Sequence, residues 1–154
     1  MNARFLGDAA ATLRAGERLA DLVRGGDAIA LIGDLGAGKT TLVTGLVAGL
    51  GGGEAASPTF SLVNEYPGGR LVVWHVDLYR IERAAELPEL GLDDAIGDPC
   101  GICVVEWADR FAVLPADHLR IELDHAEAGR VATPSGTGPR GRELAAELLR
   151  SSSP

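Results

Sequence analysis

The sequence predicts an α/β domain whose central sheet is mixed but mostly parallel and is flanked by helices. Residues 28–32 and 101–106 are short, almost entirely apolar runs, which are typical of strands buried on both faces. The first run leads into a glycine-rich loop and then a helical pattern, and further strand and helix patterns follow. With 154 residues the chain fits one domain, expected over residues 1–150, with a frayed tail at 151–154.

The first half of the chain is expected to contain two helices and three strands. A helix over residues 8–24 begins at Asp8, a residue type favoured at N-caps, and ends at a Gly-Gly pair. After the apolar strand and the glycine-rich loop, a second helix is expected over 41–50, where three glycines end it. Strands at 61–66 and 71–76 flank the sequence Pro-Gly-Gly-Arg, which is a hairpin signal.

The second half continues with alternating elements. In chain order we expect a helix at 81–87, a helical turn at 92–96, the strand at 101–106, a helix at 108–114, a strand at 118–123, a paired segment at 130–133 and an amphipathic helix at 142–150. Residues 133–141 are rich in Gly, Pro, Ser and Thr and are expected to form a loop.

The composition disfavours several classes of protein. The net charge is −8 and the sequence pI is about 4.8, and no cluster of Lys and Arg provides the basic patch that nucleic-acid phosphates attract. No apolar run approaches the roughly 18 residues of a membrane-spanning helix, and no secretory signal is recognisable. We therefore expect a cytoplasmic protein that binds neither DNA nor a membrane, and that reaches RNA only through a partner protein.

Two cysteines, Cys100 and Cys103, have the C-x-x-C spacing of redox pairs and zinc half-sites. A second cysteine pair or a closely spaced pair of histidines would be needed to complete a zinc site, and neither is present. Cys103 also lies inside the apolar run, where a thiol behaves as a small hydrophobic group. We therefore interpret the pair as structural.

The glycine-rich loop carries the clearest chemical signal. Residues 33–40 read Gly-Asp-Leu-Gly-Ala-Gly-Lys-Thr and match G-x-x-x-x-G-K-[ST], the phosphate-binding loop of P-loop NTPases. Glycines let backbone N–H groups surround phosphate oxygens, and the following helix presents its positive end to the same anion. The candidate nucleotide-binding residues are Gly33, Asp34, Gly36, Ala37, Gly38, Lys39, Thr40 and Thr41.

Lys39 is the only lysine among the 14 basic residues of the chain. A phosphate loop requires a compact ammonium group, which the wide planar guanidinium of arginine does not replace. A chance glycine-rich turn is the alternative interpretation, but the sole lysine falls on the lysine of the motif. We therefore expect Lys39 to reach the β- and γ-phosphates and the Thr40 hydroxyl to bind Mg²⁺.

Two carboxylates follow strand patterns. Asp77 ends the segment Val-Val-Trp-His-Val-Asp, and Glu106 ends the segment Ile-Cys-Val-Val-Glu. Acids at the ends of buried strands near a phosphate loop can hold Mg²⁺ or orient water for phosphoryl transfer. Each could alternatively be a solvated strand end, but the nearby phosphate loop favours the functional interpretation.

Two further segments are less specific. Residues 57–60, Ser-Pro-Thr-Phe, could form a switch that senses the γ-phosphate, or an ordinary polar turn, and local reasoning alone favours the turn. Residues 94–97 match the D-x-x-G of GTPases in letters, but no buried strand precedes them and the chain has no N-K-x-D motif that would recognise guanine. A GTP switch is therefore not expected.

Taken together, these segments resemble the bacterial TsaE family, the ATPase component of tRNA threonylcarbamoyladenosine synthesis. The matching segments are the phosphate loop at 33–41, Ser-Pro-Thr-Phe at 57–60, Asn-Glu-Tyr at 64–66, His-Val-Asp-Leu-Tyr-Arg at 75–80 and Val-Glu-Trp at 105–107. The resemblance covers residues 8–125. Only the phosphate loop is shared widely with other NTPases, so the other segments make the combination specific.

The resemblance implies a P-loop fold and weak, Mg²⁺-dependent hydrolysis of ATP. It also implies partnership with a threonylcarbamoyl transferase subunit and its paralogous scaffold subunit, which modify the tRNA adenosine next to the anticodon. In this family the ATPase is thought to reset the complex between turnovers, and it meets tRNA only through the complex.

The resemblance also implies roles for individual residues. Lys39 and Thr40 would bind phosphate and Mg²⁺, Glu106 would coordinate the metal, and Asp77 would act at the γ-phosphate by positioning water. Thr59 belongs to the switch-like segment, and Trp107 would shape the site or the partner surface. Thr12 and Arg130 are candidates for contacts to the adenine.

Two rival functions remain open. A small-molecule kinase is a P-loop protein of similar size, although the usual lid with clustered arginines is not recognisable here. A regulatory module would be controlled by ATP occupancy rather than by hydrolysis.

Overall fold

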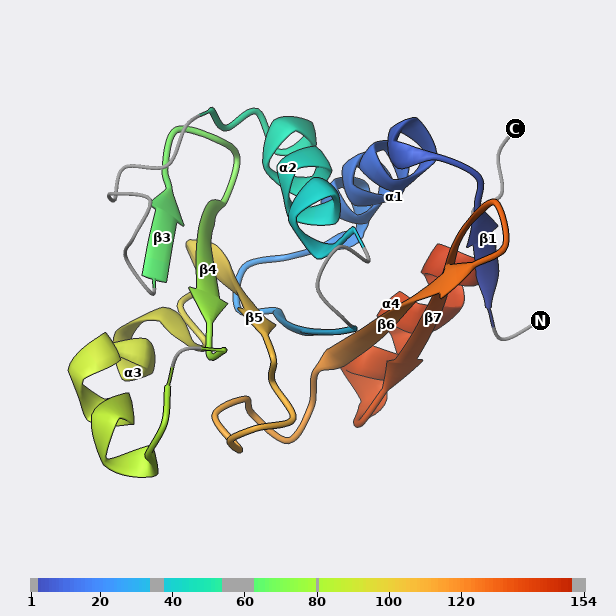
Figure 1. Ribbon diagram of the computed structural model, residues 1–154. Coiled ribbons are helices and arrows are strands. Elements are labelled where there is room, and N and C mark those ends of the chain that lie inside the picture. The colour runs from blue at the N-terminus through green and yellow to red at the C-terminus, as the bar shows by residue number, and fades with distance from the viewer. Residues whose placement is uncertain (1–2, 34–37, 54–62, 80, 151–154) are drawn as a thin grey trace.

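The computed structural model describes residues 3–33, 38–53, 63–79 and 81–150, and within them it confirms an α/β architecture (Figure 1). The strands are β1 (Arg4–Leu6), β2 (Ala28–Ile32), β3 (Val63–Tyr66), β4 (Val72–Asp77), β5 (Gly101–Glu106), β6 (Leu119–Ala126) and β7 (Gly129–Gly136). The helices are α1 (Ala9–Leu22), α2 (Lys39–Gly49), the 3₁₀ helix η1 (Ala84–Leu90), α3 (Leu92–Ala95) and α4 (Pro139–Arg150). None of the described helices combines the length and apolarity needed to cross a bilayer.

The seven described strands form one mixed sheet in the order β1-β7-β6-β2-β5-β4-β3. Its centre is parallel, because β2 pairs in parallel with β5 and β6, and β4 with β5. Antiparallel strands complete the sheet, with β7 and β1 on one side and β3 on the other. The carboxyl ends of β2, β4 and β5 therefore meet at one edge, where α/β proteins place their ligands.

Helices α1 and α2 lie side by side over one face of the sheet (Figure 1). Their backbones approach so closely that only glycine fits at the contact: a Cβ at Gly16 would lie 2.2 Å from the carbonyl oxygen of Leu42, and one at Gly45 would lie 2.1 Å from that of Leu13. The larger apolar core joins these two helices and α4 to the strands beneath them.

A second, smaller core covers the opposite face near β4 and β5. Val76, Cys103 and Val105 point into it, and Leu78 and Ile81 close it. Partly buried side chains of η1 and of residues 107–114 pack against the same cluster. Successive side chains of β4 and β5 point to opposite faces of the sheet, so these two strands contribute to both cores.

The amino end of β2 is closed by paired charges. The Arg140 guanidinium donates hydrogen bonds to both oxygens of Asp27, at 2.8–3.3 Å, and to the carbonyl of Leu22. The hydrogen bonds to Asp27, and after them the bond to Glu143, raise the pKa of Arg140. Asp117 accepts from the backbone N–H groups of Arg140 and Gly141, and these bonds lower the pKa of its carboxyl. The start of α4 is therefore tied to the start of β2.

Two expectations about the second half of the chain were wrong. Residues 108–114 form turns and bends rather than a helix, because their apolar side chains reach the second core from an irregular segment. Much of 133–141 is ordered: β7 continues to Gly136 and α4 begins at Pro139, three residues before the expected start. Proline suits the first turn of a helix because its missing N–H would be unpaired there.

Smaller differences concern element types and ends. The short strand β1 was not expected, and residues 84–90 form a 3₁₀ helix where an α-helix over 81–87 was predicted. Helix α2 begins at Lys39, so the last two residues of the motif already belong to it. The two-helix, hairpin and buried-strand pattern of the first half is otherwise confirmed for the described residues, while the tail 151–154 lies outside them.

Candidate nucleotide-binding site

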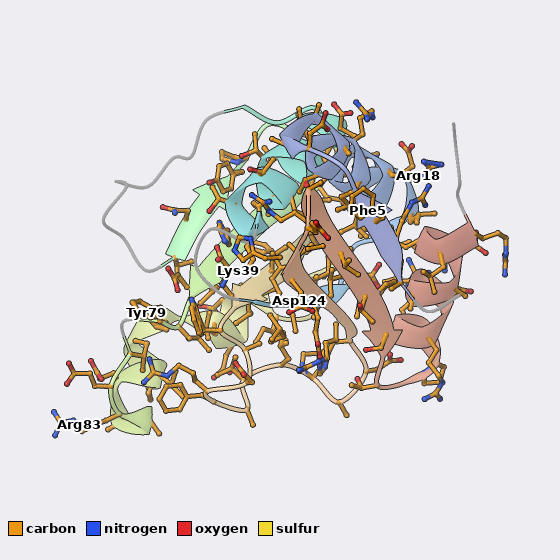
Figure 2. All side chains as sticks on the ribbon, turned by 45° about the vertical axis from the view of Figure 1, so that its right-hand side comes forward. Phe5, Arg18, Lys39, Tyr79, Arg83 and Asp124 are labelled. Atoms are coloured by element: carbon orange, nitrogen blue, oxygen red, sulfur yellow. The ribbon has the colours of Figure 1, made fainter. Side chains whose placement is uncertain are left out.

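The candidate site lies where the amino end of α2 meets the carboxyl ends of β4 and β5. Lys39 opens α2 and is only 4% exposed, while Glu106, the last residue of β5, is 7% exposed. Asp77 is the last residue of β4 and pairs with Glu106 in the sheet register. Figure 2 shows Lys39 near the centre of the molecule, on the side where these strands end. Three predicted site residues are thus brought together from three elements.

The loop around Lys39 depends on glycine. Gly33 has φ = 150° and Gly38 has φ = 105°, both in the region of backbone space that favours glycine. Gly38 is the N-cap of α2, and no side chain of the described residues caps the first N–H groups of the helix, which face a ligand in this position. This is the local geometry that the motif predicts.

The ammonium group of Lys39 has three neighbours. It donates a 2.5 Å hydrogen bond to the carbonyl oxygen of Gly33, lies 3.9 Å from Oε1 of Glu106, and sits 4.2 Å from the centroid of the Trp107 ring. An ammonium has three N–H donors, and only one of them is used in a hydrogen bond to the described residues. Within that part of the chain, the buried cation is held in place and keeps donor capacity for anionic oxygens.

Trp107 follows directly on Glu106 and has an unusual backbone. Its φ of 60° is in the left-handed region, which bulky side chains rarely adopt. The ring lies 5.0 Å from that of Tyr79, centroid to centroid, and Tyr79 is 48% exposed. Strained conformations of this kind concentrate at functional sites. Trp107 therefore forms one wall of the site and joins Lys39 to a surface aromatic ring.

Asp77 is half-buried, and one of its oxygens accepts a 2.9 Å hydrogen bond from the backbone N–H of Tyr79. The charge of Glu106 also affects the pKa of Tyr66, the last residue of β3. Burial first, and then the negative charge of Glu106, raise the pKa of the Tyr66 phenol. The charge of Glu106 is therefore felt at the Tyr66 phenol on the neighbouring strand of β4.

Thr12 and Arg130, the two candidates for adenine contacts, lie together beside the phosphate loop. A Cβ placed on Gly38 would be 3.4 Å from Cγ2 of Thr12 and 3.5 Å from Nε of Arg130. Thr12 is buried on α1 and its hydroxyl bonds to the carbonyl of Asp8, while Arg130 is half-buried on β7. Residues distant in sequence thus flank one glycine of the motif.

The oxygens near the site suit Mg²⁺. Glu106 Oε1 lies 3.9 Å from Nζ of Lys39, and the Thr40 side chain is exposed at the helix start. Mg²⁺ is commonly held by one or two protein oxygens together with substrate phosphates. Among the described residues, no group of three or more His, Cys, Asp and Glu could hold a metal.

Several predicted residues cannot be placed. Asp34, Gly36, Ala37 and the segment with Thr59 lie outside the described residues. Thr41 is half-buried in the first turn of α2. Both thiols are free: Cys100 is exposed, whereas Cys103 is buried in the strand as expected, and burial raises the pKa of Cys103 to about 12.

One contact in the site was not predicted. His75, 8% exposed on β4, places Nε2 against Oε2 of Glu106. The only signal in the sequence was that the histidine stands two residues before Asp77, which places both side chains on one face of a strand. The pairing partner on β5 could not be read from local sequence.

Comparisons with known proteins agree with this geometry. Residues 6–132 match the family model of the threonylcarbamoyl adenosine biosynthesis protein TsaE. The tRNA threonylcarbamoyladenosine biosynthesis protein TsaE of Nostoc sp. is 42% identical over 129 residues, which cover 81% of this chain and 79% of the relative. The corresponding protein of Bacillus subtilis is 41% identical, with 81% and 79% covered.

A solved structure supports the fold. The crystal structure of Bacillus subtilus YdiB matches this chain with a TM-score of 0.79 and 32% sequence identity, covering 96% of this chain and 93% of that one. The mixed, helix-flanked sheet is thus a P-loop NTPase-type fold, as predicted. The family match spans the phosphate loop, both strand-end acids and Arg130. The chain therefore belongs to the TsaE family, which takes part in the biosynthesis of threonylcarbamoyladenosine in tRNA.

Proposed function

We propose that this protein is a Mg²⁺-dependent ATPase subunit that supports threonylcarbamoylation of the tRNA adenosine next to the anticodon. The observation that carries the proposal is the state of Lys39. It is the only lysine of the chain, it is 4% exposed at the start of a helix, and among the described residues its ammonium has a single hydrogen-bond acceptor. A buried cation with spare donors favours an anionic ligand, because an isolated buried charge is costly.

The chemistry assigned to each residue follows from its position. Lys39 and the amides at the start of α2 would hold the phosphates, with Thr41 in the same turn. Thr40 and Glu106 would hold Mg²⁺, which supplies charge neutralisation at the phosphates. Asp77, half-buried at the end of the adjacent strand, would orient the attacking water.

Thr12 and Arg130 would contact the nucleotide beyond the phosphates. They flank Gly38, and they come from α1 and β7. The Arg130 side chain, half-buried, offers donors to a ring nitrogen or a ribose oxygen. We assign these contacts to the adenosine part of ATP.

The protein would act as one subunit of a complex in the cytoplasm. A net charge of −8 does not suit direct binding to tRNA, because the phosphate backbone attracts basic surfaces. We propose that a threonylcarbamoyl transferase subunit and its paralogous scaffold subunit bind the tRNA, and that ATP hydrolysis by this subunit supports their turnover.

The test is ATP hydrolysis with Mg²⁺, measured for the protein alone and after addition of the transferase–scaffold pair and tRNA. Low activity alone that rises with the pair supports the proposal. Activity that is indifferent to the pair, but appears with a small hydroxyl acceptor, identifies a small-molecule kinase instead.

The regulatory alternative is tested at Asp77. If hydrolysis supports turnover, Asp77→Ala should retain ATP binding and lose both hydrolysis and stimulation of tRNA modification. If the variant loses hydrolysis but still supports modification in the reconstituted complex, ATP occupancy alone is sufficient.

A further inference from the structure

His75 is the only one of the three histidines that is buried. It is 8% exposed, whereas His118 is half-buried and His125 is exposed on β6. Histidine is uncommon in an apolar strand, so its place within β4 needs a physical reason. Its neighbours in the strand, Trp74 and Val76, are apolar.

The sheet register explains how His75 reaches Glu106. His75 pairs with Val104 of β5, and the next pair on the same face is Asp77 with Glu106. His75 is thus the diagonal neighbour of Glu106, within reach of a long side chain. Parallel pairing of β4 and β5 therefore fixes both acids and the imidazole on one face of the sheet.

The two oxygens of Glu106 have different surroundings. Oε2 is in hydrogen-bond contact with Nε2 of His75, while Oε1 lies 3.9 Å from Nζ of Lys39. A carboxylate only accepts, so the donor of the first bond is the Nε2–H group. The other ring nitrogen, Nδ1, is buried and has no hydrogen-bond partner among the described residues. The imidazole therefore makes one polar contact there, and that contact is to Glu106.

We propose that His75 is a positioning residue that holds Oε2 of Glu106 and thereby presents Oε1 to Mg²⁺. This inference rests on the proposed function, because it assigns Glu106 to the metal. A free glutamate at a strand end has several rotamers, and a hydrogen bond from the neighbouring strand selects one of them. Loss of a hydrogen bond that orients a metal ligand typically lowers metal affinity about 10- to 100-fold.

A matched pair of amide variants separates positioning from packing. In His75→Gln the side-chain amide can place an N–H donor close to the position of Nε2. In His75→Asn the same amide is one methylene shorter and cannot reach Oε2. Both variants keep a polar amide at the buried position, so their effects on folding should be similar. His125→Asn, on the exposed part of β6, is the control.

The experiment measures binding of a fluorescent ATP analogue, first in EDTA and then during a Mg²⁺ titration, with thermal unfolding as the check on folding. We expect His75→Asn to raise the half-saturating Mg²⁺ concentration about tenfold while the Kd in EDTA stays unchanged. His75→Gln and the control should behave like the wild type. In a Glu106→Gln background, His75→Asn should produce no additional shift.

Three outcomes overturn the inference. A wild-type Mg²⁺ requirement in His75→Asn shows that the contact is not needed. An equal loss of affinity in EDTA shows that His75 supports the nucleotide site as a whole. An additional shift in the Glu106→Gln background shows that it acts through another group. If the wild type binds no nucleotide, or binds it without regard to Mg²⁺, the proposed function fails, and this inference fails with it.

A measurement on the wild-type protein decides the question if His75→Asn does not fold. Side-chain ¹⁵N NMR signals of His75 should shift when Mg²⁺ is added to the ADP-saturated protein, because the metal withdraws charge from Glu106. The signals of His125 should not shift. Unchanged His75 signals at saturating Mg²⁺ would contradict the inference.

Discussion

At the amino end of β2, Arg140 and Asp27 satisfy one another through three hydrogen bonds, whereas at its carboxyl end Lys39 and Glu106 stay 3.9 Å apart. Asp27 accepts a further bond from the backbone of Arg24, and Arg140 also bonds to Glu143. Lys39 has one hydrogen-bond acceptor among the described residues, a backbone carbonyl. Within the described residues, β2 thus separates a pair of charges that are hydrogen-bonded to each other from a pair that is not.

The difference shows how buried charge is used in this fold. A charged pair whose donors and acceptors are all used stabilises the connection between two elements and has little left for a ligand. A pair that is buried but not saturated retains capacity to bind, at a cost to the stability of the protein without ligand. Substitutions at the two ends should therefore separate stability from binding.

Lys39→Ala should have the largest effect, and it should affect binding alone. Loss of the ammonium removes charge-assisted hydrogen bonds to phosphate worth about 2–3 kcal/mol, or roughly 30- to 150-fold in Kd. The Tm should fall little, because the lysine makes one hydrogen bond to the described residues. The measurement is ATP binding by calorimetry together with thermal unfolding. Normal ATP affinity in this variant would reject the site.

Asp27→Asn should have the opposite effect: it should lower the stability of the protein and leave ATP binding unchanged. The neutral amide keeps the shape of the carboxylate but leaves the Arg140 charge without its main partner, which should cost about 2 kcal/mol of stability. For a chain of this length the Tm should fall by about 4–8 °C. Affinity for ATP should be unchanged, because the substitution lies at the far end of β2. A matching loss of affinity would contradict the separation of the two ends.

The smallest effects should come from the cysteines. At neutral pH a thiol reagent should modify Cys100, which is exposed, and leave Cys103 unmodified until the protein unfolds. Burial raises the pKa of Cys103 from 9.0 to about 12, so the unfolded thiol ionises first. The stability from this burial is complete below pH 9 and declines as the pH rises toward about 12. Denaturant unfolding across this range checks the direction, with Cys103→Ala expected to flatten the decline.

The phosphate loop was predictable because its chemistry is local. The residues from Gly33 to Thr40 carry the backbone freedom, the cation and the helix start within one short segment. The strand-end acids were predictable for a similar reason, since each ends an apolar run. Alternation of strands and helices indicates parallel strands. The carboxyl ends of parallel strands lie at one edge of the sheet, so the two acids were expected at the same edge.

The contact of His75 with Glu106 was not predictable, because it depends on the register between β4 and β5. The capping of α4 by Asp117 was missed for the same reason: the acceptor lies more than 20 residues before the amides it binds. In both examples the partner comes from another element, so no local pattern records it.

The last residues of β7, from Pro134 to Gly136, were mistaken for part of a loop because residues 133–141 are rich in Gly, Pro, Ser and Thr. Proline cannot donate to a strand ladder and is therefore usually confined to edges. Within the residues that the structure describes, β1 pairs with residues 130–132, and Pro134 has no strand partner on that side. The described part of the sheet therefore flanks β7 on both sides along only part of its length. Composition alone does not distinguish these parts.

The contact between α1 and α2 has a mechanical consequence for the phosphate loop. The atoms that a side chain at Gly16 or Gly45 would strike belong to backbone, so repacking of side chains cannot relieve the collision. Gly45 lies six residues after Lys39 in helix α2, about 9 Å along the helix axis. A methyl group at either glycine would push the two helices apart and would therefore displace the Lys39 ammonium. The absence of a side chain at Gly16 and Gly45 thus fixes the position of this cation relative to the sheet.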